Sequence, residues 1–344
     1  MAVKPLAAIL VLVAVFLAAA CGGGGEKASP TPALTPGGSP AATASPAGSP
    51  AVTVPAAGTL GPPVQRGAPL PTGKIAFTSN RDGNLEIYVT TAVGQEVNFT
   101  NNPGEDWDSS WSADGKKLAW ASNRDGSFNI FVANADGSGL IKLTTGDAGD
   151  RMPRWSPDGK RMTFSRQGTI MVMNSDGTDV KTVMEAEPES TAPPCKAGSF
   201  LGGWSPDGKR ITYYAASPTR QISQICTVNA DGTDIKAVKS DADFHAEPAW
   251  SPTADLIVYR SIRGGLEGNN EIYTIKSDGS NDTDLTNNPA LDIEPTFSPD
   301  GKWVAFSSNR YGNFEMFVVR TDGSDLMQIT DSSGKDSDPA WGPE

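Results

Sequence analysis

The sequence predicts an all-β fold, a six-bladed β-propeller with four antiparallel strands in each blade. Three observations carry this prediction. An aromatic anchor recurs at nearly constant spacing, the runs between anchors have the length and apolar pattern of β-strands, and no stretch has helical periodicity. Four-strand units that repeat every roughly 40 to 50 residues are typical of propeller blades.

The anchor motif marks the first strand of each unit. It reads WSADGK at Trp111, WSPDGK at Trp155 and Trp204, WSPTAD at Trp250, FSPDGK at Phe297 and WGPE at Trp341. The aromatic residue is expected to pack between blades, and the Asp-Gly pair of most copies suits a tight hairpin to the second strand. A feature that every blade shares indicates architecture and not function.

The other strands follow in a fixed order. Second strands are expected to start near Ile75, Leu118, Met162, Ile211, Leu256 and Val304. Third strands then lead into fourth strands through Asp-Gly turns at Asp136, Asp176, Asp231, Asp278 and Asp322. Because the chain enters on a second strand and ends on a first strand, the C-terminal strand is expected to pair with the three N-terminal strands and close the ring.

The first 72 residues have the composition of a leader and a linker. Lys4, the apolar run 6–20 and the sequence LAAAC at 17–21 predict a signal peptide over 1–20 and lipidation of Cys21. The alternative is an ordinary signal peptide that is cut near Ala20. Residues 21–72 are rich in Pro, Ala, Ser and Gly, which predicts a disordered tether and leaves 73–344 as the folded domain.

The charge of the folded part excludes some classes of function. The chain has 28 basic and 40 acidic residues, of which three basic and one acidic residue lie in 1–72, so the remainder has a net charge of −14. Such a domain is not expected to bind nucleic acid or an anionic membrane surface. Its only histidine, His245, excludes zinc sites with several histidine ligands and is expected to be a solvated loop residue.

The motifs P-x-W-S-P-D-G-K, S-N-R-D-G and I-Y-V together resemble the repeats of TolB-type propellers, and the resemblance covers all of 73–344. It implies the propeller fold and the binding of partner peptides at an acidic channel mouth. TolB itself has a separate α/β domain before the propeller, where the tether is expected here. The similar propellers of prolyl oligopeptidase and dipeptidyl peptidase accompany a hydrolase domain, which is not expected in this chain.

Acidic residues recur five and three positions before the anchors. Eight of these twelve positions hold carboxylates, namely Asp106, Asp108, Asp150, Glu247, Asp292, Glu294, Asp336 and Asp338, and the other four hold Met152, Ser199, Leu201 and His245. At the beginning of the innermost strands the carboxylates and His245 are expected to form one mouth of the central channel. There they would bind a protein or basic peptide, or Ca²⁺ through Asp292 and Asp336.

The alternative to a binding mouth is a structural role for these carboxylates. Arginines recur in the loops of the same face, between second and third strands, at Arg81, Arg124, Arg166, Arg263 and Arg310. Pairing with these arginines would compensate most of the acidic charge.

Three segments break the repeat and are expected to project from the same face, namely 185–203, 216–223 and 261–271. They cluster on the blades anchored by Trp204 and Trp250, which makes them the preferred recognition patch. Cys195 and Cys226 are the only cysteines of the folded part. Export and an even count favour a disulfide between them, and two unpaired thiols are the alternative.

These features favour a monomeric binding or scaffolding propeller, lipid-anchored on the extracytoplasmic side of a bacterial membrane, with an envelope or extracellular protein or peptide as its partner. One alternative is an extracellular enzyme that cleaves glycan or peptide with channel carboxylates. No G-x-S-x-G motif accompanies the single histidine, and the glycan-cleaving propellers that this chain resembles use histidine-bound metal. The other alternative is a calcium-dependent sensory ectodomain.

Overall fold

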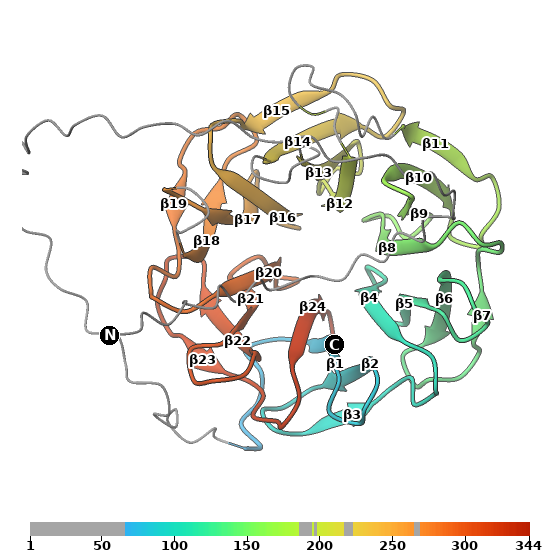
Figure 1. Ribbon diagram of the computed structural model, residues 1–344, viewed down its shortest axis with the longest axis horizontal. Helices are drawn as coiled ribbons and strands as arrows, with labels where there is room; N and C mark the ends of the chain where they lie inside the picture. The colour runs from blue at the N-terminus through green and yellow to red at the C-terminus, as the bar shows by residue number, and fades with distance from the viewer. Residues whose placement is uncertain (1–65, 186–194, 196–197, 217–222, 265–268) are drawn as a thin grey trace, which may run out of the picture. The chain divides into compact units, whose positions relative to one another are not determined.

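The computed structural model describes residues 66–185, 195, 198–216, 223–264 and 269–344, all within the compact unit Thr53–Glu344 (Figure 1). The predicted signal peptide, Cys21 and most of the predicted tether lie outside the described residues. The part of the chain that is described contains no helix that is long and apolar enough to cross a membrane.

The described residues form six antiparallel sheets arranged as blades around a central axis (Figure 1). Within each blade the first strand lies nearest the axis and the fourth lies at the rim. The second and third blades contain β4 (Asp106–Trp111), β5 (Lys117–Ser122), β6 (Asn129–Asn134), β7 (Ile141–Lys142), β8 (Asp150–Trp155), β9 (Arg161–Arg166), β10 (Thr169–Asn174) and β11 (Lys181–Met184).

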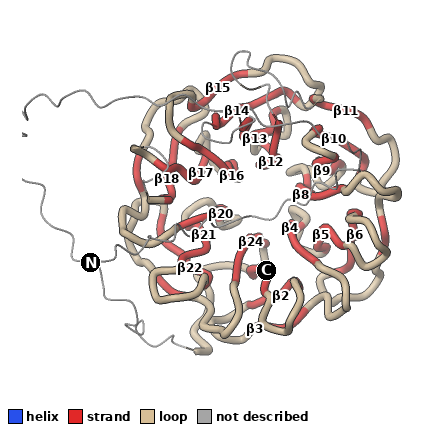
Figure 2. The backbone as a smooth tube through the Cα atoms, viewed as in Figure 1, coloured by secondary structure: helices blue, strands red, loops and turns tan. Residues whose placement is uncertain are grey.

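The next three blades repeat this order. They contain β12 (Gly198–Trp204), β13 (Arg210–Ala216), β14 (Ser223–Asn229), β15 (Lys236–Lys239), β16 (Phe244–Trp250), β17 (Ile257–Ile262), β18 (Asn270–Ile275), β19 (Thr283–Asp284), β20 (Asp292–Phe297), β21 (Trp303–Ser308), β22 (Glu315–Arg320) and β23 (Met327–Gln328). Figure 2 shows strands joined by loops and turns, and no helix, among the described residues of these blades.

The remaining blade is made from both ends of the folded chain. The C-terminal strand β24 (Asp336–Gly342) pairs with β1 (Lys74–Ser79), which is followed by β2 (Glu86–Thr90) and β3 (Glu96–Asn98). In this antiparallel pairing Ile75 lies opposite Trp341. The six-bladed architecture and its closure by the C-terminal strand are therefore confirmed.

The aromatic anchors pack between blades, as predicted. Trp111 is 7% exposed and belongs to a cluster that joins Ala76 and Ile87 of one blade to Leu118 and Phe131 of the next. Burial of such large rings is the main favourable contribution to packing between neighbouring sheets.

The Asp-Gly hairpins between first and second strands form tight turns, as predicted. They lie at the end of the blades opposite to the connections between second and third strands. In the hairpin between β8 and β9, Ser156 Oγ donates to Asp158 Oδ1 at 2.6 Å, and Gly159 N donates to Ser156 O at 2.9 Å. Gly159 has a φ of 68°, a left-handed conformation that glycine adopts at little cost. These turns define the turn face, and the connections between second and third strands lie on the other face, here called the loop face.

The packed chain begins before the predicted boundary at residue 72. Val93 N donates to Ala68 O at 2.9 Å, and Trp341 Nε1 donates to Thr72 O at 2.7 Å. Leu70 is only 7% exposed and joins the core of the closing blade. The physical reason is that Leu70 is a large apolar side chain that can be buried against the closing blade.

Candidate binding site

Two sets of side chains begin the inner strands on the loop face. The strand-start ring holds the residues five positions before each anchor, namely Asp106, Asp150, His245, Asp292 and Asp336. The bulge ring holds those three positions before each anchor, namely Asp108, Met152, Glu247, Glu294 and Asp338. Ser199 and Leu201 occupy the two positions on β12, and their side chains lie outside the described residues.

Arginines pair with every carboxylate of the strand-start ring. Arg124 contacts Asp106 at 3.1 Å, Arg166 contacts Asp150 at 2.7 Å, and the two other pairs are Arg310 with Asp292 at 3.1 Å and Arg81 with Asp336 at 2.8 Å. All four carboxylates are at most 2% exposed. These ion pairs support the structural role that was the alternative for this ring. Buried paired charges stabilise the fold only while both partners are present.

Other side chains of the protein donate hydrogen bonds to the carboxylate oxygens of this ring. Asn288 Nδ2 donates to Asp292 Oδ2 at 2.5 Å, and Ser332 Oγ donates to Asp336 Oδ1 at 3.3 Å. Among the described residues no group of three His, Cys, Asp or Glu side chains is arranged to hold a metal ion. The surroundings of Asp292 and Asp336 thus do not fit the calcium site expected from the sequence, since Ca²⁺ requires several free oxygen ligands.

His245 departs from the prediction that it is a solvated loop residue. Its side chain is fully buried on β16, where Nδ1 lies 2.9 Å from Ser261 Oγ and Nε2 lies 2.6 Å from Asp241 Oδ1. The prediction was wrong because the histidine replaces a strand-start aspartate inside the packed ring. Burial lowers the pKa of His245, and the nearby Asp241 carboxylate opposes that shift only in part.

The loop arginine of the blade that contains His245, Arg263, also has different partners from the other loop arginines. Arg263 Nη2 contacts Asp282 Oδ1 at 2.8 Å and Tyr259 Oη at 3.1 Å instead of a strand-start carboxylate. This is the one arginine of the recurrent loop set that does not pair with a strand-start residue.

Hydrogen bonds link Ser261, His245 and Asp241 in the order of a Ser-His-Asp catalytic triad. Ser261 is fully buried on the second strand of its blade, however, and its backbone pairs with neighbouring strands on both sides. A nucleophile has to reach the substrate carbonyl, so this arrangement does not support hydrolysis. We assign it to packing between strands.

The bulge ring has an unusual backbone. Its five residues have φ angles between 52° and 58°, and each sits where the pairing of its inner strand with the next strand shifts register. Left-handed backbone is disfavoured for residues other than glycine, and a β-bulge at such a position changes the direction of a side chain. The bulge therefore separates Asp108 from Asp106, although only one residue lies between them.

Hydrogen bonds connect neighbouring members of the bulge ring. Glu294 N donates to Glu247 Oε2 at 2.8 Å, and Asp338 N donates to Glu294 Oε2 at 2.9 Å. Met152 N donates in the same way to the Asp108 carboxylate. Each of these carboxylates thus accepts a hydrogen bond from the bulge of the following blade, which links the inner strands around the axis.

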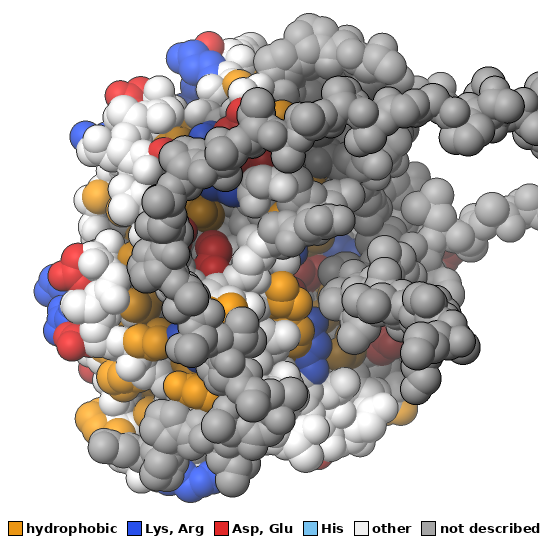
Figure 3. Space-filling model, turned by 60° about the vertical axis from the view of Figure 1, so that its left-hand side comes forward, with side chains coloured by type: hydrophobic (Ala, Val, Ile, Leu, Met, Phe, Trp, Pro, Cys, Tyr) orange, Lys and Arg blue, Asp and Glu red, His pale blue; other side chains and the backbone are white. Residues whose placement is uncertain are grey.

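The bulge ring contains more carboxylates than paired cations. Arg260 contacts Glu247 at 3.0 Å, whereas Arg154 donates to two backbone oxygens, Gly202 O at 3.0 Å and Pro153 O at 2.9 Å. Burial, followed by repulsion from neighbouring carboxylates, raises the pKa of Asp338 well above its ordinary value. Figure 3 shows acidic side chains close to basic ones on the visible surface of the described residues.

Arg154 was not identified from the sequence, although a signal was present. It stands directly before the anchor Trp155, where the other blades have the small residues Ser110, Gly203, Ala249, Thr296 and Ala340. Its charge acts on both Asp108 and Asp338, and burial lowers its own pKa. A comparison of all six repeats at this position would have shown the exception.

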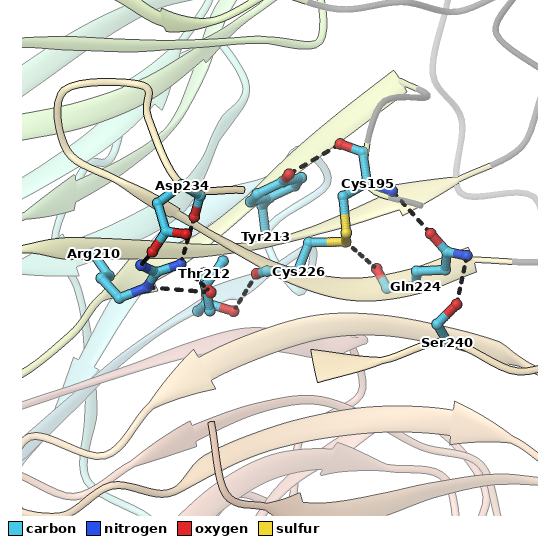
Figure 4. The surroundings of a disulfide bond; sticks show 9 residues. Cys195, Arg210, Thr212, Tyr213, Gln224, Cys226, Asp234 and Ser240 are labelled. Atoms are coloured by element: carbon cyan, nitrogen blue, oxygen red, sulfur yellow. Dashed lines mark hydrogen bonds and ion pairs between the residues drawn. A yellow bond between two sulfur atoms is a disulfide. The ribbon is translucent and has the colours of Figure 1, made fainter. Parts of the chain in front are cut away.

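The structure joins Cys195 and Cys226 in a disulfide (Figure 4). Cys195 N donates to Gln224 Oε1 at 2.9 Å, and Tyr213 Oη donates to Cys195 O at 2.9 Å. These contacts fix Cys195 against β13 and β14. Residues 186–194, 196–197, 217–222 and 265–268 of the predicted recognition patch lie outside the described residues.

Comparison with known proteins places these features in a family. The family described as TolB beta propeller domain matches residues 65–198 and 166–344. An uncharacterized protein of Agrobacterium fabrum, Atu1656, is 29% identical over 162 residues, which are 46% of this chain and 51% of that protein. A TolB homolog of Chlorobium luteolum is 32% identical over 78 residues, 23% of this chain and 17% of the homolog. The chain thus spans about half the length of the first of these relatives and less of the second.

Solved structures share the same fold. TolB from Acinetobacter baumannii superposes with a TM-score of 0.64 at 21% identity, covering 79% of this chain and 67% of that one. A putative TolB from Agrobacterium tumefaciens gives a TM-score of 0.59 at 21% identity, covering 77% of this chain and 91% of that one. Together with the family match over both halves of the propeller, these findings show that the chain belongs to the TolB beta propeller family.

Proposed function

We propose that this protein is a binding propeller of the bacterial cell envelope that recognises a protein or peptide on its loop face. Relatives of the chain include proteins named for the Tol-Pal system, such as TolB of Francisella tularensis, which is 37% identical over 65 residues. That match covers 14% of the relative, so the partners of the relative are not assigned to this chain.

One observation carries the proposal. The two rings of the loop face differ in charge compensation, because every strand-start carboxylate is paired with an arginine and three of the four bulge-ring carboxylates have no ion-pair partner among the described residues. Arginine pairing compensates the charge of the first ring but not that of the second. Concentrated charge of one sign in a concave, poorly hydrated place attracts ligands of the opposite sign.

Attachment to the membrane is the second part of the proposal. Cys21 would carry the lipid, and residues 22–65 would hold the propeller away from the membrane surface. Incorporation of a labelled fatty acid, abolished by Cys21→Ser, tests this part independently. Labelling that persists in the variant would contradict it.

The binding face can be tested by site-specific photo-crosslinking in cells. A photoreactive amino acid would replace Asp125 or Asp147 on the loop face, or Asp136 or Asp278 on the turn face, since all four side chains are exposed. We expect a discrete protein adduct from the loop-face positions only. Adducts from the turn face alone, or from none of the four positions, would contradict the proposal.

A further inference from the structure

We propose that an open cleft on the turn face binds a pyranose ring of an uncharged glycan, with the indole of Trp155 as its floor. The cleft lies between the second and third blades and has a volume of about 600 Å³. Clefts of about 300 to 1,000 Å³ that combine aromatic surface with a few polar groups are typical of small-molecule sites. This site lies on the face opposite to the proposed protein-binding face and does not depend on that proposal.

Trp155 is more exposed than most of the aromatic anchors. The exposed fraction is between 4% and 8% for Trp111, Trp204, Phe297 and Trp341, whereas Trp155 and Trp250 are only partly buried. What covers an anchor is the residue at the start of the second strand in the preceding blade. The identity and conformation of that residue therefore decide whether the ring can contact a ligand.

In two of the other clefts this residue is a cation that covers the ring. Lys74 Nζ lies 4.5 Å from the centre of the Trp111 ring and donates to Gly115 O at 2.8 Å. Arg161 lies over Trp204 in the same way, at 4.6 Å. Each cation thus occupies the space beside the ring that a ligand would need.

Lys117 is the corresponding residue beside Trp155, and it leaves the ring uncovered. Its side chain is exposed and makes no hydrogen bond, ion pair or ring contact to any described residue. The hairpin glycine of this cleft, Gly159, also faces open space, because a Cβ atom there would meet no atom within 4 Å beyond its chain neighbours. At the corresponding Gly115, a Cβ atom would lie 2.9 Å from Pro343 O. The cleft beside Trp155 is therefore open to a ligand.

Polar atoms with free hydrogen-bonding capacity line the same cleft. Asn134 Nδ2 donates to Ser138 Oγ at 3.0 Å, but Asn134 Oδ1 accepts no hydrogen bond from a described residue. Asp158 Oδ1 accepts from Ser156 Oγ at 2.6 Å, and Asp158 Oδ2 has no partner in the described part of the chain. Together with Lys117 Nζ, the cleft offers two acceptors and one donor beside the indole.

These features fit an uncharged ring that carries hydroxyl groups. The charged side chains of the cleft balance one another, since they are the carboxylates of Asp114 and Asp158 and the ammonium groups of Lys116 and Lys117. An apolar protein side chain would desolvate the free polar atoms without giving them partners. A pyranose with equatorial hydroxyls has C–H groups on its faces and hydroxyls at its edge, so it can stack on the indole and bond to Asn134, Asp158 and Lys117 together.

Isothermal titration calorimetry of the full chain tests this inference with two probes, cellotetraose and N-acetylated chitotetraose. Both are straight chains of rings with equatorial substituents, and they distinguish a glucose source from an N-acetylglucosamine source. Sorbitol, which has hydroxyls but no ring, is the control ligand. We expect saturable binding of at least one tetrasaccharide and none of sorbitol. Absence of binding for both tetrasaccharides would overturn the inference.

The first variant fills the cleft and keeps its charge. In Lys117→Arg the guanidinium should cover Trp155 as Arg161 covers the anchor of the next blade. Binding should weaken at least tenfold, and the unfolding midpoint should not fall. Lys74→Arg is the matched control, because Trp111 is already covered in the parent, and this variant should bind like the parent.

The second variant removes a hydrogen-bond acceptor. Asn134→Ala should also weaken binding at least tenfold. Asn174→Ala is its control, because Asn174 donates to Thr178 Oγ1 at 2.9 Å as Asn134 does to Ser138, but it does not line the cleft. Unchanged binding in both cleft variants, or equal weakening in their controls, would overturn the inference.

Discussion

Arg81 Nη2 donates a hydrogen bond to Asp336 Oδ2 at 2.8 Å, although 255 positions separate the two residues in sequence. Arg81 follows β1 and Asp336 begins β24, so the pair spans the seam where the two ends of the propeller meet. The guanidinium also lies over the Tyr88 ring at 4.4 Å. The same pairing occurs within single blades elsewhere, but here it also holds the ring closed.

Removal of one member of this pair should open the seam. We expect Asp336→Ala to lower the free energy of unfolding by about 3 kcal/mol, because it leaves a poorly solvated guanidinium without its carboxylate. Denaturant unfolding measures the change, with Asp147→Ala at an exposed position as the control. A loss equal to that of the control would show that backbone pairing of β24 alone closes the ring.

The stability of the protein should decrease between pH 5 and pH 8 through two buried glutamates. Burial raises the pKa of Glu271 to about 7, and it raises that of Glu315 in the same direction. Between the ordinary value near 4.5 and the raised value, the folded state binds more protons than the unfolded state, so a rise in pH favours unfolding. The slope is at most about 1.4 kcal/mol per pH unit for each group.

The measurement is the free energy of unfolding against pH for the parent and for Glu271→Gln, with Glu105→Gln as an exposed control. The difference between parent and Glu271→Gln should change with pH in the predicted direction, and Glu105→Gln shows how far the same substitution affects stability at an exposed position. His245 acts in the opposite sense below pH 6.5, but it is present in all three proteins and cancels in the comparison. A pH-independent difference for Glu271→Gln would contradict the prediction.

The disulfide should stabilise the fold mainly by restricting the unfolded chain. Cys195 and Cys226 are 31 positions apart, and closure of a loop of that size is worth about 3 to 4 kcal/mol in the chain-entropy model. We expect dithiothreitol to lower the unfolding midpoint of the parent. The double variant Cys195→Ala, Cys226→Ala should unfold at a similarly low midpoint and be insensitive to the reductant.

The protonation of His245 can be followed directly, because it is the only histidine in the chain. Its imidazole proton signals should titrate at a lower pH in the folded protein than in urea, since burial lowers the pKa. The unfolded state then binds more protons below pH 6.5, and this residue costs stability as the pH falls. A folded-state titration above that in urea would show that Asp241 outweighs burial.

The repeat made most of the architecture predictable from sequence. Each unit carries its own anchor, its own Asp-Gly turns and its own strand-length runs, so local signals such as those around Trp155 and Asp158 were sufficient for blades and topology. The early start of the packed chain at residues 67–72 was not predicted. Its evidence is a single apolar side chain, Leu70, whose burial depends on a partner blade.

The roles of single residues were harder to predict from the sequence than the architecture, as Asp106 and Asp108 show. Both are acidic residues before the same anchor, and the sequence gives no reason to separate them. In the structure Asp106 is paired with Arg124, whereas Asp108 has a left-handed backbone at a β-bulge and an Oδ2 atom that is buried without a hydrogen-bond partner. His245 was misassigned for a similar reason, since its partners Asp241 and Ser261 come from a preceding loop and a neighbouring strand.

The sequence by itself determined the number of blades, the order of the strands and the closure, because these depend on signals that lie within each repeat. Only the tertiary structure decided which carboxylates pair with an arginine and which have no ion-pair partner among the described residues. The physical reason is that the charge state and contacts of a buried group depend on neighbours from other strands and blades, as those of Asp108 and Asp338 do on each other across two neighbouring blades.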